Sequence, residues 1–384
     1  MAADKGTKMT RLKSQLKKST TILVAMQLTL CGTFALSTSA FADGLSYEPR
    51  LYRSAHFLGR GDTGISVADE EDAIFYNPAG LALGKGIYKK TVLVSPQVEL
   101  SEATRDLARR LGAENADAVE TVQNNIGKPN HFGLQNFTGL ILRRAALGVI
   151  VSNNIDLLAY KSADYGGMEV VEASVDQNVG ATFSLADTFF HPKLMMGITA
   201  KYLARGRGSM TVISVEADKV QDELSNTADF IGMGEGGGID FGLMYQGGGR
   251  TNPAFGLTVN DIGDTKIKPT EETNLDLDFK QQVNIGASIE PGTKFSKLKL
   301  LADYRDITGA VIKNPYKRFH MGGELSVLSM IGIMGGINQG YPTAGLYFDF
   351  YILRFDFGYY TEEMGDRIGT RPDTRYFVRL EAGF

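Results

Sequence analysis

The chain has little cysteine, histidine or tryptophan, and these absences exclude several kinds of site. Its 384 residues include one Cys, four His and no Trp. Cys31 lies within the first 42 residues, which have the layout of a cleaved signal peptide, so the mature chain has no thiol. Disulfides, thiolate catalysis and cysteine-ligated metals are thereby excluded. The histidines show no metal-ligand spacing, and we expect neither a metal nor a cofactor: they are His56, His131, His191 and His320.

Long hydrophobic runs are absent except near the N-terminus. Residues 1–42 combine a basic start, an apolar run over 21–36 and the small-residue pattern "SAFA" ending at Ala42. This is the layout of a secretory signal peptide, with the mature chain beginning near Asp43. A lipoprotein signal using Cys31 is the alternative, but Leu30 is bulkier than the small residue expected before a lipidated cysteine.

Positive charge is also scarce in the mature chain. Once the six basic residues and one acid of 1–42 are set aside, 34 basic and 43 acidic residues remain. An excess of acids argues against nucleic acid as a partner. No other apolar run reaches the roughly 18 residues of a membrane-spanning helix. If the exported chain enters a membrane, it therefore does so as a β-barrel.

Alternation of apolar and polar residues dominates the chain from about residue 131. In "QVNIGASIE", Ile285 and Ile289 point to one face, while Asn284 and Ser288 point to the other. A period of two is typical of a strand with two different faces. The pattern predicts fourteen strands, at 87–99, 131–142, 145–156, 177–187, 193–205, 236–246, 253–262, 280–290, 296–306, 317–326, 331–338, 341–350, 351–361 and 374–384.

The connections between these strands alternate between long and short, apart from a short one at 339–340. Long loops on one rim and tight turns on the other are typical of outer-membrane barrels. A soluble β-sandwich is the alternative, but nothing makes its alternate connections longer. A final strand that ends on Phe384 also resembles the terminal signature of outer-membrane proteins. We therefore predict an all-β fold, a fourteen-stranded antiparallel transmembrane barrel over 87–384, in the outer membrane of a Gram-negative type of cell.

Charged residues fall on the face of the strands that would line the barrel lumen. In one account they pair and make a narrow interior rigid; in the other they form the wall of a polar channel. The sequence favours pairing, because both signs occur. The lumen charges are Lys201, Asp240, Asp303, Arg305, Arg318, Glu324, Arg354, Asp356, Arg379 and Glu381.

Residues 43–86 precede the first strand and contain "ADEEDAIFYNPAGLA". Acids from Asp69 to Asp72 suit the first turn of a helix, where free N–H groups favour negative charge. Pro78 disfavours a helical Asn77, and Gly80 can adopt the left-handed conformation of a helix cap. A helix of about two turns is too short to be stable alone. We expect residues 43–86 to form a plug that packs inside the barrel.

A second helical segment is predicted in the first long loop. Within 101–126, apolar residues recur at helical spacing, from Leu107 and Leu111 to Val122 and Ile126. One or two amphipathic helices are expected there.

The segment "GDTGISVADEEDAIFYNPAGLALG" resembles the outer-membrane long-chain fatty-acid transporter superfamily of the FadL type, with its PorV-like and TraF-like relatives. The resemblance rests on Ala68 and Asp69, on Asp72 and Ala73, and on the run from Tyr76 to Leu81. It implies a fourteen-stranded barrel with an N-terminal plug, and a hydrophobic small molecule that passes when the plug rearranges. The implied plug and ligand residues are Ile74, Phe75, Tyr76, Asn77, Pro78, Ala79, Leu81 and Leu83.

Two functions follow as hypotheses. The first is admission of hydrophobic small molecules through a plugged lumen in contact with outer-membrane lipid. The feature expected to distinguish it from the second is a continuous apolar cavity beneath residues 74–83. The second is an interaction protein whose loops at 100–130 and 206–235 bind an exported protein. No catalytic set of side chains is apparent from spacing, so we do not expect an enzyme.

Overall fold

The structure is a computed structural model that describes residues 48–84, 86, 88–111, 126–161, 167–213, 231–292, 296–328 and 330–384. The predicted signal peptide, Cys31 included, lies outside these residues. So do residues 112–125 and 214–230 of the two longest loops.

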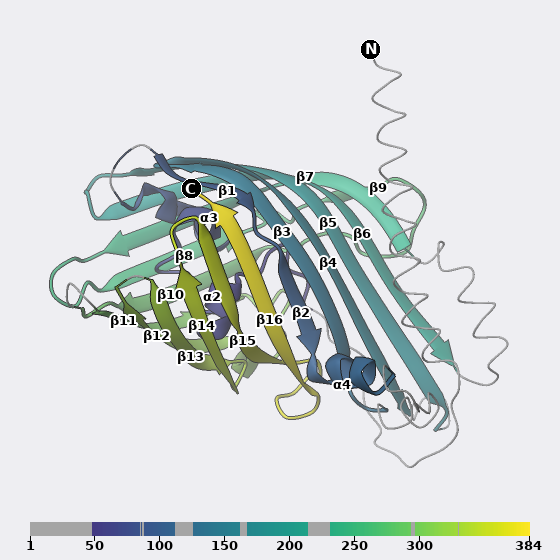
Figure 1. The fold of residues 1–384 in the computed structure, drawn as a ribbon. Helices are drawn as coiled ribbons and strands as arrows, with labels where there is room; N and C mark the ends of the chain where they lie inside the picture. Colours follow the sequence, from purple (N-terminus) through teal and green to yellow (C-terminus); the bar gives the residue numbers. More distant parts are fainter. Residues whose placement is uncertain are drawn as a thin grey trace.

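In the described part of the chain, sixteen strands form one antiparallel sheet that closes into a barrel (Figure 1). β1 and β2 share one position between β16 and β3, and β9 pairs only with β7, which leaves the predicted fourteen barrel positions. The strands are β1 Tyr88–Val94, β2 Gln97–Ser101, β3 Asn130–Leu142, β4 Ala145–Lys161, β5 Glu169–Thr188, β6 Leu194–Ile213, β7 Ile231–Gln246, β8 Ala254–Asn260, β9 Ile267–Pro269, β10 Gln282–Ile289, β11 Ser296–Tyr304, β12 Phe319–Val327, β13 Ile331–Asn338, β14 Tyr341–Asp349, β15 Leu353–Glu363 and β16 Pro372–Gly383.

Three details of the strands differ from the prediction. The first strand is broken at Ser95 and Pro96, because proline cannot donate to the ladder. β9 lies in a segment that the sequence suggested was a loop. β4 to β7 extend beyond the alternating segments, where successive residues such as Val170 and Val171 are both buried. In β4 and β5, alternation therefore fails as a marker, since successive residues of these segments are buried.

The two rims of the barrel carry different connections. On the turn rim, hairpins follow β3, β5, β7, β10, β12 and β14, and the chain ends there at Phe384. On the loop rim lie the described connections 261–281, 305–318 and 364–371, together with the ends of β2, β4 and β6. The loop rim also carries η4, a short 3-10 helix at Pro315–Arg318 that leads into β12. This is the predicted asymmetry of long and short connections.

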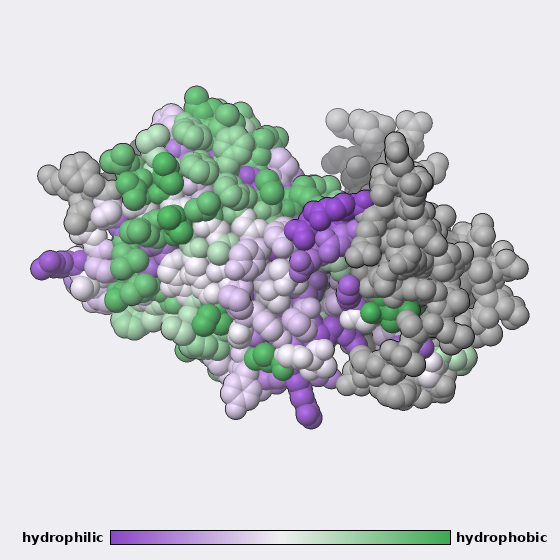
Figure 2. Space-filling model, turned by 60° about the horizontal axis from the view of Figure 1, so that its bottom comes forward, coloured by the Kyte–Doolittle hydropathy of each residue, from purple (hydrophilic) through white to green (hydrophobic). Residues whose placement is uncertain are grey.

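The barrel wall is apolar outside and polar inside. On β10, Ile285 and Ile289 are exposed, whereas Asn284 and Ser288 are buried in the lumen. A soluble protein has the opposite arrangement. Hydrophobic residues gather in a wide area of the outer surface in Figure 2. This distribution is that of a barrel whose outer face meets lipid.

Within the described residues, no helix is both long and apolar enough to cross a membrane.

Three short helices of the plug lie inside the curve of the sheet (Figure 1): α2 Ala55–Gly59, α3 Glu70–Tyr76 and the 3-10 helix η2 Pro78–Ala82. α3 is the predicted two-turn helix, and it ends at an extended Asn77 with φ −160° and ψ 99°. Gly80 differs from expectation because it lies within η2 and has no left-handed φ. A Cβ atom there would lie 1.8 Å from the carbonyl oxygen of Ala68, so close packing requires the glycine.

The predicted helical insert at 101–126 is present in its first part as α4, Glu102–Leu111. It follows β2 directly and lies at the loop rim beside β2, β3 and β16. The remaining expected residues, 112–125, lie outside the described part of the chain.

Candidate functional site

The plug lies directly against the inner barrel wall along a track of glycines. A Cβ atom on Gly242 of β7 would lie 2.1 Å from Oδ1 of Asn77, and one on Gly197 of β6 would lie 2.3 Å from the carbonyl carbon of Pro78. Further along the plug, Gly256 of β8 faces the backbone of Ile65, and Gly322 of β12 faces the backbone of Arg60. Any larger residue at these four glycines would push the plug away from the wall.

Hydrogen bonds from wall side chains hold the plug backbone at the same places. Oδ2 of Asp303 accepts from the backbone N–H groups of Gly64, at 2.7 Å, and Ile65, at 3.1 Å. Oγ1 of Thr343 accepts from the N–H of Gly61 at 2.9 Å. Nδ2 of Asn260 donates to the carbonyl of Phe75 at 3.2 Å. Backbone N–H and carbonyl groups of the plug that are buried away from water therefore form hydrogen bonds with side chains of the barrel wall, as buried backbone groups require.

Asn77 joins the plug to itself and to β7. Its Nδ2 donates to the carbonyl oxygens of Ile65, at 2.7 Å, and Leu243, at 3.1 Å. Its Oδ1 accepts from the N–H of Ala79 at 3.2 Å, which caps η2. A side chain that supplies two donors and an acceptor in this way must be an amide.

A buried ionic network links the plug to β1, β12, β15 and β16. Arg379 contacts Asp356 at 2.9 Å, and it contacts both Glu71 of α3 and Glu381 at 3.5 Å. Nζ of Lys90 lies 3.1 Å from Glu71. Burial alone would raise the pKa of Glu71, but Lys90 and Arg379 beside it hold that pKa below its ordinary value.

The network continues on β12 through two side chains of the plug. Arg60 pairs with Glu324, and Nε2 of His56 lies 3.0 Å from the same carboxylate. Arg354 of β15 contacts Asp356 at 3.1 Å. The predicted pairing of lumen charges is therefore seen, but the plug supplies several of the partners.

Further ion pairs involve Lys201 of β6, Asp240 of β7, and the residues that directly follow β8 and β11, Asp261 and Arg305. Lys201 is 2.8 Å from Asp240 and 2.8 Å from Asp261. Arg305 is 3.0 Å from Asp62 of the plug. Burial would raise the pKa of Asp62, but Arg305 and Arg50 hold it below its ordinary value.

Arg318 is the predicted lumen charge that lies elsewhere. It ends η4, and its guanidinium donates to the carbonyl oxygens of Ile307, Ile312 and Lys313 in the preceding loop. The chain turns through the 3-10 helix before β12 begins at Phe319, so the strand alternation does not apply to Arg318.

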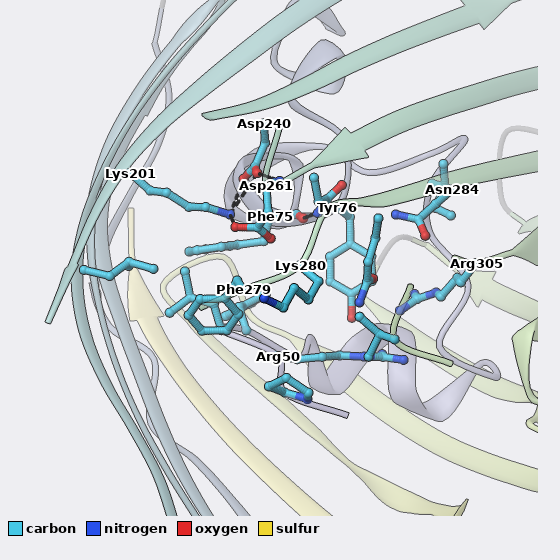
Figure 3. A pocket seen from close by; sticks show the side chains of 18 residues that line it. Arg50, Phe75, Tyr76, Lys201, Asp240, Asp261, Phe279, Lys280, Asn284 and Arg305 are labelled. Atoms are coloured by element: carbon cyan, nitrogen blue, oxygen red, sulfur yellow. Dashed lines mark hydrogen bonds and ion pairs between the residues drawn. The ribbon is translucent and has the colours of Figure 1, made fainter. Parts of the chain in front are cut away.

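A cavity of about 90 Å³ lies between the plug and the loop rim. Its apolar lining includes Phe75 and Tyr76 of α3, Tyr52 and Phe279. Figure 3 shows Lys201, Asp240 and Asp261 at one end, Asn284 and Arg305 at the other, and the aromatic rings between them. The rings of Tyr52 and Phe75 stack with centroids 4.3 Å apart. Lys280 and Arg50 lie among these rings (Figure 3), so the cavity combines aromatic walls with charged groups along its length.

The structure separates the plug residues that the sequence grouped together. Phe75 and Tyr76 line the cavity. Ile74, Ala79 and Leu81 are fully buried in the packing between plug and wall, and Leu83 packs against the same core. Asn77 and Pro78 face the glycines of β6 and β7.

The expectation of a continuous apolar cavity beneath residues 74–83 is wrong for the described structure. η2 is packed directly on β5, β6 and β7 there. The cavity lies on the other side of α3 and includes charged side chains. Its remaining aromatic lining, Tyr52 and Phe279, could not be anticipated, because neither residue belongs to an alternating strand or to the plug motif.

Among the described residues, no group of three or more His, Cys, Asp or Glu side chains is arranged to hold a metal ion.

No known sequence-family profile matches the chain, and no curated protein matches it. Solved structures do. The toluene transporter TodX of Pseudomonas putida is 11% identical with a TM-score of 0.49, and the alignment covers 88% of this chain and 99% of that one. The monoaromatic hydrocarbon channel CymD is 10% identical with a TM-score of 0.47, covering 90% and 98%. A FadL homologue of Pseudomonas aeruginosa is 12% identical with a TM-score of 0.45, covering 89% and 99%. At these identities, the similarity is one of fold alone.

Proposed function

We propose that the protein is an outer-membrane barrel that admits small hydrophobic molecules from the loop rim into the cavity above the plug. The observation that carries the proposal is the cavity itself, which lies inside a lipid-facing barrel and has four aromatic side chains, Tyr52, Phe75, Tyr76 and Phe279, beside charged and amide groups in its lining. Aromatic walls with a few polar groups are typical of small-molecule sites. The resemblance of the plug segment to FadL-type transporters agrees with this function.

The size of the cavity favours a small cargo. Drug-sized ligands occupy pockets of roughly 300–1,000 Å³, whereas this cavity measures about 90 Å³. A long acyl chain does not fit without displacement of α3. The cations at the cavity ends are already bound to acids, as Lys201 is to Asp240 and Asp261. They therefore favour no anionic cargo.

Movement beyond the cavity requires the plug to part from the wall. Asn77 and Pro78 seal the plug onto β6 and β7 through the glycine contacts and the hydrogen bond to Leu243. We infer that passage loosens this contact and leaves the ion pairs of Arg379 in place, because breaking one hydrogen bond costs less than separating buried charges.

Binding of an exported protein remains without a supporting observation. Much of its proposed interface, the loops at 100–130 and 206–235, lies outside the described residues.

The test is the entry of a small aromatic probe into vesicles that contain the purified protein. Val311 lines the cavity, and its neighbour Ala310 is exposed on the same loop. We expect Val311→Trp to fill the cavity and slow entry to the rate of empty vesicles, and Ala310→Trp to leave entry unchanged. Equal rates for the wild-type protein and empty vesicles would contradict the proposed function. If both variants slowed entry equally, the probe would not pass through the cavity.

A further inference from the structure

Three hairpins on the turn rim carry bulky apolar residues in a backbone conformation that favours glycine. Phe190 in the β5–β6 turn has φ +57°, Leu328 after β12 has φ +54°, and Tyr351 in the β14–β15 turn has φ +72°. A large side chain at positive φ is uncommon and strained. Turns with this geometry ordinarily use Gly, Asn or Asp.

These same side chains are among the most exposed of the molecule. Phe190 is 98% exposed, Tyr351 is 86% exposed and Leu328 is 62% exposed. Phe350 and Ile352, on either side of Tyr351, are also exposed. Apart from the contact of Phe190 with its neighbour Phe189, whose ring centroid is 5.8 Å away, these strained and exposed apolar side chains are open to a partner outside the barrel.

Another hairpin on the same rim shows that the geometry does not require apolar residues. The β7–β8 turn, residues 247–253, has the sequence GGGRTNP. It places Gly248, Gly249 and Asn252 at positive φ, and its Arg250 and Thr251 are exposed. The turn rim therefore contains both polar and apolar tips.

The apolar tips continue the lipid-facing surface of the wall. Leu185 leads into the β5–β6 turn on the outer face, Val327 precedes Leu328, and Leu353 follows the β14–β15 turn, and all three are exposed. In the order of strands around the barrel, the β12–β13 and β14–β15 turns are close together, and the β5–β6 turn lies across the ring from them. The apolar tips thus flank the barrel on two sides.

We propose that these three turns are inserted in the interfacial layer of the bilayer, where they anchor the turn rim in phospholipid. Aromatic and aliphatic side chains are favoured at that depth, with backbone polar groups still close to water. The occupant is lipid because the tips extend an outer face that already meets lipid. Polar tips such as Thr251 lie outside this layer.

The absence of tryptophan from the chain allows a direct test. Single variants Phe190→Trp, Leu328→Trp and Tyr351→Trp are reconstituted in vesicles of phosphatidylcholine and phosphatidylglycerol, with Thr251→Trp as the matched control. Folding of each is verified by retention of the compact form on unheated gels. We expect the tryptophan fluorescence of the three variants to lie at shorter wavelength than that of Thr251→Trp. Brominated phospholipid should quench it at least about threefold more strongly than in the control, since aromatic rings are favoured at the bilayer interface.

Two outcomes would overturn the proposal. Tryptophan emission typical of a water-exposed ring at the three sites, with lipid quenching equal to that of Thr251→Trp, would show that the turns lie outside the bilayer, accessible to a soluble partner. Emission at short wavelength without lipid quenching would place them in a contact between copies of the chain.

Discussion

The missing side chain of Gly242 lets the plug lie against the barrel wall. A methyl group there would lie 2.1 Å from Oδ1 of Asn77 and 2.8 Å from Cδ of Pro78. We expect Gly242→Ala to lower the free energy of unfolding by about 1–3 kcal/mol, as overpacking does. Gly335→Ala is the control, because its nearest neighbour would be 3.8 Å away. The measurement is urea unfolding in detergent micelles, and equal stability of the two variants would show that the plug adjusts freely.

Arg379 and Arg318 looked alike from the sequence, and the structure distinguishes them. Arg379→Met leaves Asp356 and Glu71 buried with a missing partner, which typically costs about 3–5 kcal/mol. Arg318→Met removes only hydrogen bonds to loop carbonyls. We expect a much larger fall in unfolding midpoint for the first variant. A similar small fall in both would mean that the lumen network contributes little to stability.

At the level of residues, the sequence predicted which side chains of a strand face the lumen, but it did not predict their ion-pair partners. Alternation placed Asp356 and Arg379 in the lumen correctly. It could not show that the plug supplies Glu71 and His56 to the same network, because those contacts join residues about 300 positions apart. The aromatic lining of the cavity was found only in part for the same reason.

Among the elements, the plug helix α3 was predictable because its signals are local. Acids occupy its N-cap and first turn, and Pro78 lies two positions after its last residue, Tyr76. The plug helix α2 was not predicted, since its five residues, AHFLG, have no helical pattern of their own. β4 and β5 were predicted too short because successive residues such as Val170 and Val171 are buried there, which removes the alternation.

The link between α3 and η2 gives a prediction about the plug. Asn77→Ala removes the cap of η2 and the bonds to Ile65 and Leu243, and loss of an asparagine cap alone costs about 0.5–2 kcal/mol. We expect faster hydrogen exchange in residues 65–83 and altered entry of the aromatic probe, with normal membrane insertion.

The chain offers a close control for Asn77→Ala. Asn314 also precedes a proline and caps a 3-10 helix, by accepting from the N–H of Tyr316 at 3.0 Å, but it lies in a loop. Asn314→Ala should leave the plug and probe entry unchanged. Unaltered entry in an inserted Asn77→Ala variant would count against a gating plug.

At the scale of the whole molecule, the apolar outer face of the barrel wall predicts where a charged residue is tolerated. Ile333 on β13 is 60% exposed on the outer face. A lysine at the middle of a lipid-facing wall costs roughly 2–4 kcal/mol, so Ile333→Lys should lower stability in bilayers by that order. Ile333→Leu and Thr251→Lys should have little effect. If Ile333→Lys were neutral in lipid vesicles, the outer face would not be the membrane face.

The barrel closes where its first and last strands meet. Thr91 of β1 and Phe384 exchange backbone hydrogen bonds of 2.7 and 3.0 Å, and Pro96 accepts from Leu380 at 3.0 Å. Most other ladders join consecutive strands, whereas this seam requires the longest loop closure of the chain. Contacts of large sequence separation form slowly. We therefore expect the seam to be the last ladder to form during folding, and because the plug directly precedes β1, the same step would enclose the plug.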